Sequence, residues 1–271
     1  MPGPFSRNWI LCATLLSALA GSAQDPPASP PRPTAVVPPA VRIQPPPAGH
    51  HFPEAVTYHY KAEWRLLEAG AATLRIERGQ HGEIRITGVA DSTGFVGRLY
   101  RVHDVFESTF DPKTFCSQQI RKRTEEGSRR RDATIKFDYQ RSKGVLDELN
   151  QKNGQRKHLE NDIPSCAADV LTSLFYAASL PLQPGNSYLF PVNDGGQTAT
   201  LEAYVDGREV VKTDAGSFNT LRIAPRSTPE LLKGRGRIWL WYSDDAERIP
   251  VQMRGRMGWG TLTFSLTKID R

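Results

Sequence analysis

The stretch Val56–Leu67, VTYHYKAEWRLL, decides the fold class of this chain. Apolar and polar side chains alternate along its whole length. One face would carry Val56, Tyr58, Tyr60, Ala62, Trp64 and Leu66, and the other Thr57, His59, Lys61, Glu63 and Arg65. A period of two indicates a β-strand with one dry face and one wet face, which is typical of an antiparallel sheet.

The same alternation returns along the rest of the chain. It marks Ala72–Arg78, Glu83–Ala90, Tyr100–Phe110, Ala133–Tyr139, Thr200–Val205, Ile249–Met257 and Leu262–Leu266. Glycine-containing and acidic turn sequences separate these runs, which favours hairpins. We therefore predict a mainly β protein with a large antiparallel sheet that curves into a barrel, half-barrel or sandwich.

One helix is expected, over Cys166–Leu180. Ser165 would be its N-cap, Asp169 would lie in its first turn, and Pro181 follows its end. The apolar residues recur at helical spacing: Ala167, Val170, Leu171, Leu174, Phe175 and Ala178. We expect this amphipathic helix to pack on the concave face of the sheet, where its stripe would either join the core or line a ligand cavity.

The first 23 residues have the order of a secretory signal peptide. Arg7 precedes the apolar run Trp9–Ala20, and small residues follow up to a cleavage site after Ala23. Twelve apolar residues are too few to span a bilayer core, which needs about 20. We expect a periplasmic or secreted protein without a transmembrane segment in its mature chain, with an uncleaved membrane anchor as the alternative.

A proline-rich segment follows over residues 24–53, and it holds eleven of the 21 prolines. Proline fixes φ and lacks an N–H donor, so the segment is expected to be an extended, disordered spacer. Docking to a proline-binding domain is the alternative. Residues 54–271 would then form a single β domain.

The charge is concentrated in one place. The chain has 35 Lys and Arg against 29 Asp and Glu, a net charge of +6. Arg121–Arg131 alone holds six bases and two acids. As a hairpin, it could meet an anionic envelope component such as a phospholipid headgroup, through Arg121, Arg123, Arg129, Arg130 and Arg131. The alternative is cross-strand salt bridging on a solvated face, and nucleic acid is not an expected partner because stacking aromatics are missing beside the cluster.

Two cysteines remain after the leader, Cys116 and Cys166. In an oxidising compartment, two cysteines favour a disulfide. The alternative is two separate buried thiols. Metal binding is not expected, because the pair lacks neighbouring histidine or cysteine ligands at zinc spacing.

No motif for catalysis, cofactor binding or metal binding is present. The sequence contains neither a nucleophile elbow nor a phosphate loop nor a dinucleotide fingerprint. Catalytic residues, cofactors and metals are therefore not expected. A triad assembled from residues far apart in sequence stays open, because triads are spatial arrangements.

Several stretches together resemble one bacterial family. They are Asp91–Val102 (DSTGFVGRLYRV), Ser179–Gly185 (SLPLQPG), the Ala215–Phe218 turn (AGSF) and Trp241–Val251 (WYSDDAERIPV). In this order they are similar to the domain of unknown function 3108 (DUF3108) family, over most of Ala55–Ile269. The resemblance implies an exported, β-rich envelope protein and brings no established catalytic residues. The cysteine pair departs from the family pattern.

A weaker likeness concerns the fold alone. The strand, acidic turn, proline-bearing strand and glycine-containing return over Ile238–Leu266 are similar to hairpins of LolA/LolB-type lipoprotein carriers. That likeness implies a half-barrel, closed by helices, which holds acyl chains. Fold-level analogy does not assign a function.

The leading hypothesis is a non-catalytic periplasmic binding protein or carrier for a lipid or another apolar ligand. Its cavity would be lined by Tyr58, Tyr60, Trp64, Tyr100, Phe106, Leu171 and Phe175. The second hypothesis is a structural or protein-interaction module of the envelope that docks through the basic hairpin. The third is an unrecognised hydrolase. The oligomeric state and the identity of the ligand are left open.

Overall fold

The computed structural model describes residues 41–271 except 66, 228–236 and 259. The predicted signal peptide and the predicted linker up to residue 40 lie outside the described residues. Within the described part, 14 strands form one antiparallel sheet. The strands are β1 (Ala55–Trp64), β2 (Leu67–Arg78), β3 (Ile84–Ser92), β4 (Val102–Phe110), β5 (Ser117–Glu126), β6 (Arg129–Asp138), β7 (Lys143–Asn150), β8 (Arg156–Asp162), β9 (Ser187–Asp194), β10 (Gln197–Thr213), β11 (Gly216–Ser227), β12 (Arg237–Ser243), β13 (Pro250–Met257) and β14 (Gly260–Asp270).

The sheet forms because alternate residues bury apolar side chains on one face. In β1, Val56, Tyr58, Tyr60 and Ala62 are buried, while the residues between them keep partial contact with solvent. The next strands follow the same rule: Ile76, Ile84 and Ile86 are fully buried. The predicted mainly β fold with a large curved antiparallel sheet is confirmed.

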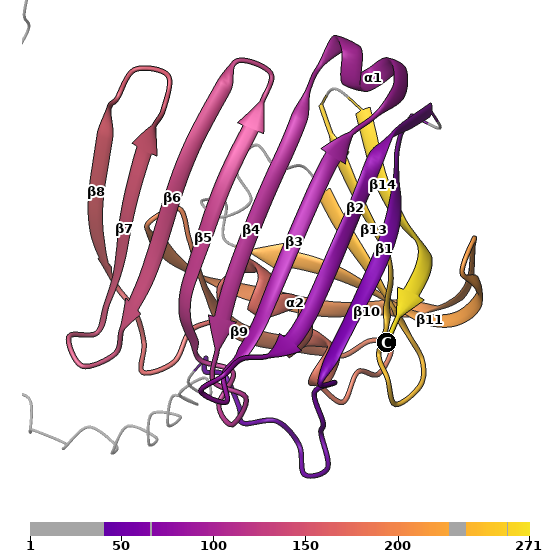
Figure 1. Ribbon diagram of the computed structural model, residues 1–271. Coiled ribbons are helices and arrows are strands. Elements are labelled where there is room, and N and C mark those ends of the chain that lie inside the picture. Colours follow the sequence, from indigo (N-terminus) through magenta and orange to yellow (C-terminus); the bar gives the residue numbers. More distant parts are fainter. Residues whose placement is uncertain (1–40, 66, 228–236, 259) are drawn as a thin grey trace, which may run out of the picture. The chain divides into compact units, whose positions relative to one another are not determined.

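Strands that are consecutive in sequence pair as neighbours, except β8 and β9. The sheet order is β8-β7-β6-β5-β4-β3-β2-β1-β14-β13-β12-β11-β10-β9, so β1 pairs with β14 and the edges are β8 and β9. The sheet is curled but not closed (Figure 1). Near the two edges, side chains replace the missing ladder: Asn193 Nδ2 donates to Asn161 Oδ1 at 3.1 Å, and Thr198 Oγ1 donates to the Asp162 carbonyl at 3.0 Å.

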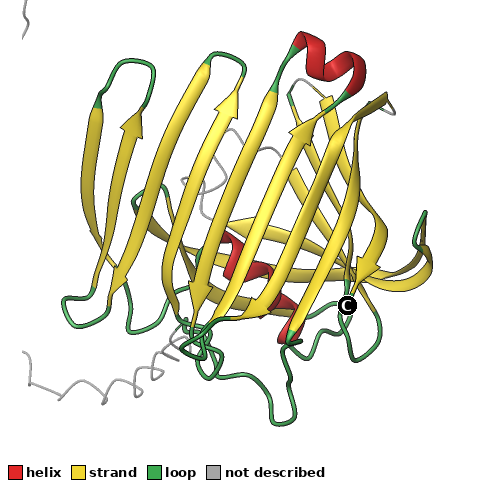
Figure 2. Cartoon of the chain, in the orientation of Figure 1, coloured by secondary structure: helices red, strands yellow, loops and turns green. Residues whose placement is uncertain are grey.

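Two helices are present in the described residues, α1 (Gly94–Leu99) and α2 (Val170–Ser179). Helix α1 connects β3 to β4, and α2 crosses the inside of the curled sheet (Figure 2). The sequence predicted only the second helix. It assigned no element to Gly94–Leu99, because six residues carry too little periodicity to identify a helix.

The expected start of α2 was wrong. Ser165 is not the N-cap. Asp169 is, and its carboxylate accepts hydrogen bonds from the backbone of Leu171 at 2.8 Å and of Thr172 at 3.0 Å. The residues before it are extended because Ala168 forms a parallel bridge with Val192 of edge strand β9. This bridge occupies the backbone groups that an earlier helical turn would need.

The buried surface of α2 extends further around the helix than the predicted stripe. Leu171 and Ala178 are buried as expected, whereas Leu174 and Phe175 are only partly buried. The other buried positions are Thr172, Tyr176, Ala177 and Ser179. A helix inside a curled sheet contacts protein on more than one side, so a single stripe does not describe its burial.

The lower end of the interior is filled by aromatic rings. Phe110 and Phe115 stack with centroids 5.5 Å apart, and Tyr176 of α2 meets Phe115 at 5.3 Å. Phe52 packs against Phe110 at 5.4 Å, and Ile43 is also buried. The described end of the predicted spacer, residues 41–53, therefore contacts the domain, because proline prevents regular secondary structure without preventing side-chain packing.

The predicted disulfide between Cys116 and Cys166 is confirmed. It joins the residue before β5 to the extended segment before α2, across 50 positions of sequence. The chain-entropy relation gives such a loop about 4 kcal/mol of stabilisation relative to the reduced chain. The bond thus fixes the start of α2 to the sheet.

Candidate functional site

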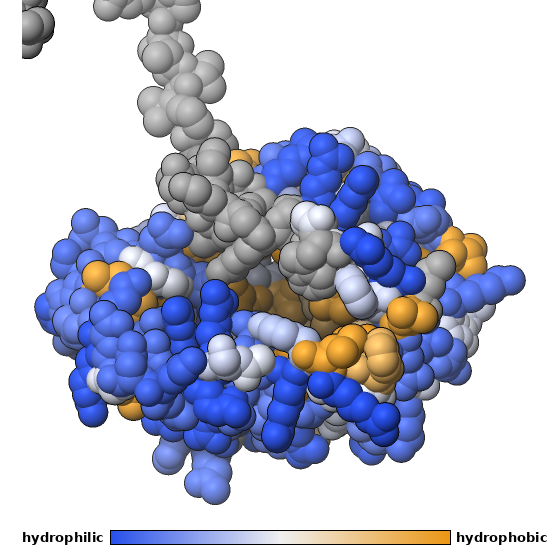
Figure 3. All heavy atoms as spheres, turned by 90° about the horizontal axis from the view of Figure 1, so that it is seen from above, coloured by the Kyte–Doolittle hydropathy of each residue, from blue (hydrophilic) through white to orange (hydrophobic). Residues whose placement is uncertain are grey.

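A cavity of about 370 Å³ lies between the curled sheet and α2. Its walls come from both halves of the sheet and from the helix. The apolar wall residues are Tyr60, Ala72, Leu74, Gly88, Val89, Ala90, Phe106, Val170, Leu171, Leu174, Val192, Leu201, Pro225, Ile238, Leu240, Trp241, Tyr242, Pro250, Met253 and Phe264. Seen from the end that carries α1, the molecule is hollowed and hydrophobic atoms are visible in the hollow (Figure 3).

The chemistry of this cavity fits an apolar ligand. Only Thr73, Asp104, Ser173 and Gln252 add polar side chains to its wall. Its volume lies within the range of about 300–1,000 Å³ that small-molecule pockets occupy, and such pockets are mostly apolar with a few polar groups.

Helix α2 is fixed in the cavity by a buried polar network around Asp169. One carboxylate oxygen caps the helix, and the other accepts from Ser108 Oγ at 2.6 Å, Ser117 Oγ at 2.7 Å and Thr172 Oγ1 at 2.9 Å. All four residues are buried. The network joins the helix to β4 and β5. It was missed in the sequence, although an aspartate directly before an apolar stripe is itself a cap signal.

Asp104 is the carboxyl group of the cavity wall. Burial raises its pKa to about 6, and the nearby Glu126 and Asp91 act in the same direction. The hydrogen bond from the Glu125 backbone to Asp104 Oδ1, at 3.0 Å, opposes this shift. The wall therefore carries a group that changes charge close to neutral pH.

Lys122 turns inward from the basic hairpin. Its Nζ forms an ion pair with Asp194, which is buried at the β9–β10 turn, and lies 5.6 Å from the centroid of the Phe106 ring. The pair links β5 to the hairpin of edge strand β9. Lys122, one base of the predicted cluster, thus forms a largely buried ion pair and is not available to an outside partner.

The other bases of the cluster mostly pair with acids on the same sheet. Arg130 lies 3.0 Å from Glu125, and Arg123 lies 3.5 Å from Asp132. Arg129 pairs with Glu126 and Arg131 with Glu148, whereas Arg121 is exposed on β5 opposite Glu107. The hairpin has the cross-strand salt bridging that was the alternative to an anion site, and contact with an anionic partner stays a prediction.

The structure brings three of the seven predicted cavity residues together. Tyr60, Phe106 and Leu171 all line the cavity. Tyr58 is buried in the core, Trp64 lies further along β1 beside Arg65, and Phe175 is a partly buried neighbour of the core.

The placement of Tyr100 on the inner face was wrong. Tyr100 is 51% exposed and precedes β4, which begins at Val102. The preceding helix α1 interrupts the alternation that would otherwise point this side chain inward. The period-two pattern could not show this, because a helix cap and a strand start look alike over two residues.

A wider groove of about 1240 Å³ lies on the other face of β12, β13, β14 and β1. Its lining combines charged and polar side chains with Trp239 and Trp241. Several of its charges already pair with one another: Lys61 with Asp214 at 3.1 Å, and Arg222 with Asp206 at 2.8 Å. Arg254 covers the Trp241 ring at 5.2 Å. This groove does not select a ligand class as clearly as the apolar cavity does.

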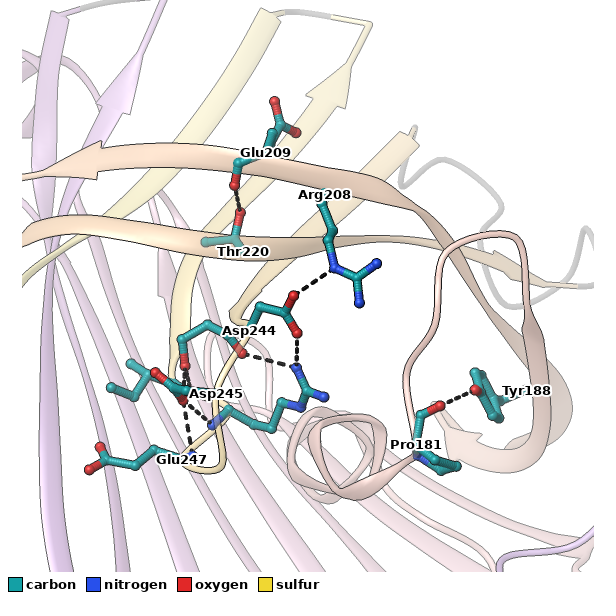
Figure 4. Close-up of polar contacts among 11 residues, drawn as sticks. Pro181, Tyr188, Arg208, Glu209, Thr220, Asp244, Asp245 and Glu247 are labelled. Atoms are coloured by element: carbon teal, nitrogen blue, oxygen red, sulfur yellow. Dashed lines mark hydrogen bonds and ion pairs between the residues drawn. The ribbon is translucent and has the colours of Figure 1, made fainter.

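The acidic turn between β12 and β13 has a structural role. The Asp244 carboxylate lies between Arg208 of β10 and Arg248, and these guanidinium groups lower its pKa (Figure 4). Asp245 accepts from the backbone of Glu247 at 3.0 Å, which closes the turn. Among the described residues, no group of three or more His, Cys, Asp or Glu could hold a metal ion.

Within the part of the chain that the structure describes, neither helix has the length and apolar character needed to cross a bilayer.

Comparison with known proteins adds the family and the fold. No curated protein matches the chain. Among solved structures, the chain is similar to the crystal structure of a beta-barrel-like protein of domain of unknown function DUF1849 from Brucella abortus, with a TM-score of 0.56 and 10% identity. That match covers 80% of this chain and 97% of the other, and it supports the fold alone. The model of the family described as "Protein of unknown function (DUF3108)" matches residues 59–267, so the chain belongs to the DUF3108 family.

Proposed function

We propose that the protein is an exported, non-catalytic binding protein of the cell envelope that holds a lipid or another apolar molecule in the cavity between its sheet and α2. The single observation that carries the proposal is the 370 Å³ cavity, whose wall is almost entirely apolar. A ligand with an acyl chain or a similar apolar body would replace the missing core atoms there.

The disulfide supports the proposed location. Such bonds persist in oxidising compartments and are rare where thiols are kept reduced. Cys116 and Cys166 are bonded in the structure, and the bond would be stable in the periplasm or outside the cell.

Gly88 offers a direct test, because it lies in the cavity wall. A Cβ added there would meet Leu171 at 3.8 Å and Leu74 at 3.9 Å, which is ordinary contact. Gly88→Leu would therefore place four carbon atoms inside the cavity with little strain on the backbone. Gly207 of β10 is the matched control, since a Cβ added there meets nothing within 4 Å.

The experiment is native mass spectrometry of the protein purified from the envelope in which it is made. The wild type and Gly207→Leu should carry one apolar molecule per chain. Gly88→Leu should carry at least fivefold less, and it should also bind the fluorescent fatty acid 11-(dansylamino)undecanoic acid at least fivefold more weakly. Equal occupancy in Gly88→Leu and Gly207→Leu, or a wild type that neither carries a ligand nor binds the probe, would overturn the proposal.

A further inference from the structure

Helix α1 displays large apolar side chains to solvent. Phe95 and Leu99 are each 69% exposed, and no residue of the helix is buried. They lie four positions apart, so both side chains project from the same face of the helix. Tyr100, which follows the helix directly, is 51% exposed.

A fourth exposed apolar side chain lies on β2, a strand that α1 contacts. Leu67, at the start of β2, is 58% exposed, and α1 contacts β2 through the bond from the Thr93 backbone to the Ala69 carbonyl, at 3.0 Å. We call Leu67, Phe95, Leu99 and Tyr100 the apical patch. It holds half of the eight large hydrophobic side chains that are exposed in the described residues. Clustered exposure of this kind marks an interaction site.

The apical patch is built on a fixed support. The Val102 backbone donates to Ser92 Oγ at 2.8 Å, and the Gly127 backbone donates to the Arg101 carbonyl at 2.7 Å. Tyr100 rests on Gly127, where an added Cβ would lie 2.7 Å from its ring. The connection between β3 and β4, which carries Phe95, Leu99 and Tyr100, is thus hydrogen-bonded to the adjacent strands and to the β5–β6 hairpin.

Two arginines lie beside the apical patch. Arg98 lies in the last turn of α1 and Arg101 follows Tyr100. Within the described chain, neither arginine has a carboxylate at ion-pair distance. Exposed apolar and aromatic side chains interleaved with arginine are typical of surfaces that enter the interface of an anionic bilayer.

The patch lies at the same end of the molecule as the hollow of the cavity. Ala90 of β3 and Asp104 of β4 line the cavity, and both lie within five positions of α1 in sequence. The opposite end of the interior is filled by Phe52, Phe110 and Phe115. The end with α1 is the one in which the space-filling view shows the hollow (Figure 3).

We infer that the apical patch docks the protein on an anionic lipid bilayer, with Phe95 and Leu99 in the interface and Arg98 and Arg101 on the headgroup phosphates. In this orientation the hollow faces the bilayer, so an apolar ligand passes between membrane and cavity without crossing water. The inference rests on the proposed function for the identity of the cargo, but docking itself is independent of the cavity.

The test is flotation of the full chain with vesicles of phosphatidylcholine and phosphatidylglycerol in a ratio of three to one. Phe95→Ser/Leu99→Ser should reduce the bound fraction at least tenfold, and Arg98→Glu/Arg101→Glu should do so only on vesicles that contain phosphatidylglycerol. The matched control is Leu189→Ser/Val210→Ser, which removes two side chains that are 51% and 59% exposed elsewhere on the molecule and should float like the wild type. Circular dichroism of each variant checks that it is folded.

The outcomes separate docking from ligand binding. Gly88→Leu should float like the wild type, because it alters the cavity and leaves the apical patch intact. A wild type that floats but carries no ligand contradicts the proposed function alone, and one that carries a ligand but does not float contradicts docking. If Phe95→Ser/Leu99→Ser floats as well as the control, or if the patch captures a protein and no vesicles, docking to a bilayer is refuted.

Discussion

Replacing Asp169 with alanine removes the residue that fixes α2 to the sheet. The carboxylate accepts five hydrogen bonds: two from the backbone of Leu171 and Thr172, and three from the hydroxyls of Ser108, Ser117 and Thr172. Alanine cannot accept any of them, and all of these polar side chains are buried away from bulk solvent.

The magnitude follows from two contributions. Loss of an N-cap costs about 1–2 kcal/mol. Each buried hydroxyl left without an acceptor costs about 1–3 kcal/mol. Ser108 and Thr172 can still bond to each other, since their oxygens are 3.1 Å apart, so only one or two hydroxyls lose every acceptor. We expect Asp169→Ala to lower the free energy of unfolding by about 4 kcal/mol.

Urea-induced unfolding, followed by tryptophan fluorescence, measures this change. Asp169→Asn keeps the oxygen that caps the helix, and its amide nitrogen can donate to two of the three hydroxyls, so its cost should be about 1–2 kcal/mol. Asp138→Ala is the control, because Asp138 makes only exposed contacts with Arg141: a turn bond from its backbone at 2.9 Å and an ion pair with its guanidinium at 4.0 Å. It should stay within about 1 kcal/mol of the wild type.

A second readout connects stability to the site. Asp169→Ala should also carry less of the proposed apolar ligand, because Val170, Leu171 and Leu174 of α2 line the cavity. An Asp169→Ala protein that unfolds at the same urea concentration as Asp138→Ala would refute the view that this network holds the helix in place.

Two further predictions concern the disulfide and the cavity carboxyl. Cys116→Ser/Cys166→Ser should lower the free energy of unfolding by about 4 kcal/mol, the loop-closure value for a separation of 50 residues; in urea titrations, a midpoint that matches the oxidised wild type would contradict this. Asp104 has a pKa of about 6 in the folded chain, against 3.8 ordinarily, so the folded state binds the proton more tightly and its stability falls as pH rises from about 4 to above 6. Asp104→Asn should remove this fall, which is about 1–2 kcal/mol, because solvent screens a carboxyl that is only partly buried. Parallel stability profiles of wild type and Asp104→Asn between pH 4 and pH 8 would show that the carboxyl is not buried in the way described.

Local patterns were sufficient to predict the strands and the disulfide. The alternation in Val56–Leu67 predicted which side chains of β1 are buried, because the pleat alternates faces whatever the tertiary context. The pairing of Cys116 with Cys166 followed from there being two cysteines after the leader. The basic hairpin was also predicted, and its turn lies at Gly127 and Ser128, between β5 and β6.

The features that make the candidate site depend on contacts between distant residues. Asp169 caps α2 because the bridge from Ala168 to Val192 holds the preceding residues extended, and no local pattern shows that bridge. Lys122 seemed part of an exposed cluster until the β9–β10 turn placed Asp194 beside it. Tyr100 is not on the inner face of the sheet because it follows α1 directly and lies before the start of β4.

The pairing of β1 with β14 has a consequence for biosynthesis. Every other neighbouring pair in the sheet is also consecutive along the chain, so β1–β8 and β9–β14 can each form from local hairpins. Their junction joins residues about 210 positions apart, as in the contact of His59 with Asp270, and closing so large a loop is slow. The cavity takes its walls from both halves. A nascent chain therefore has no complete cavity until β14 has been made and has paired with β1.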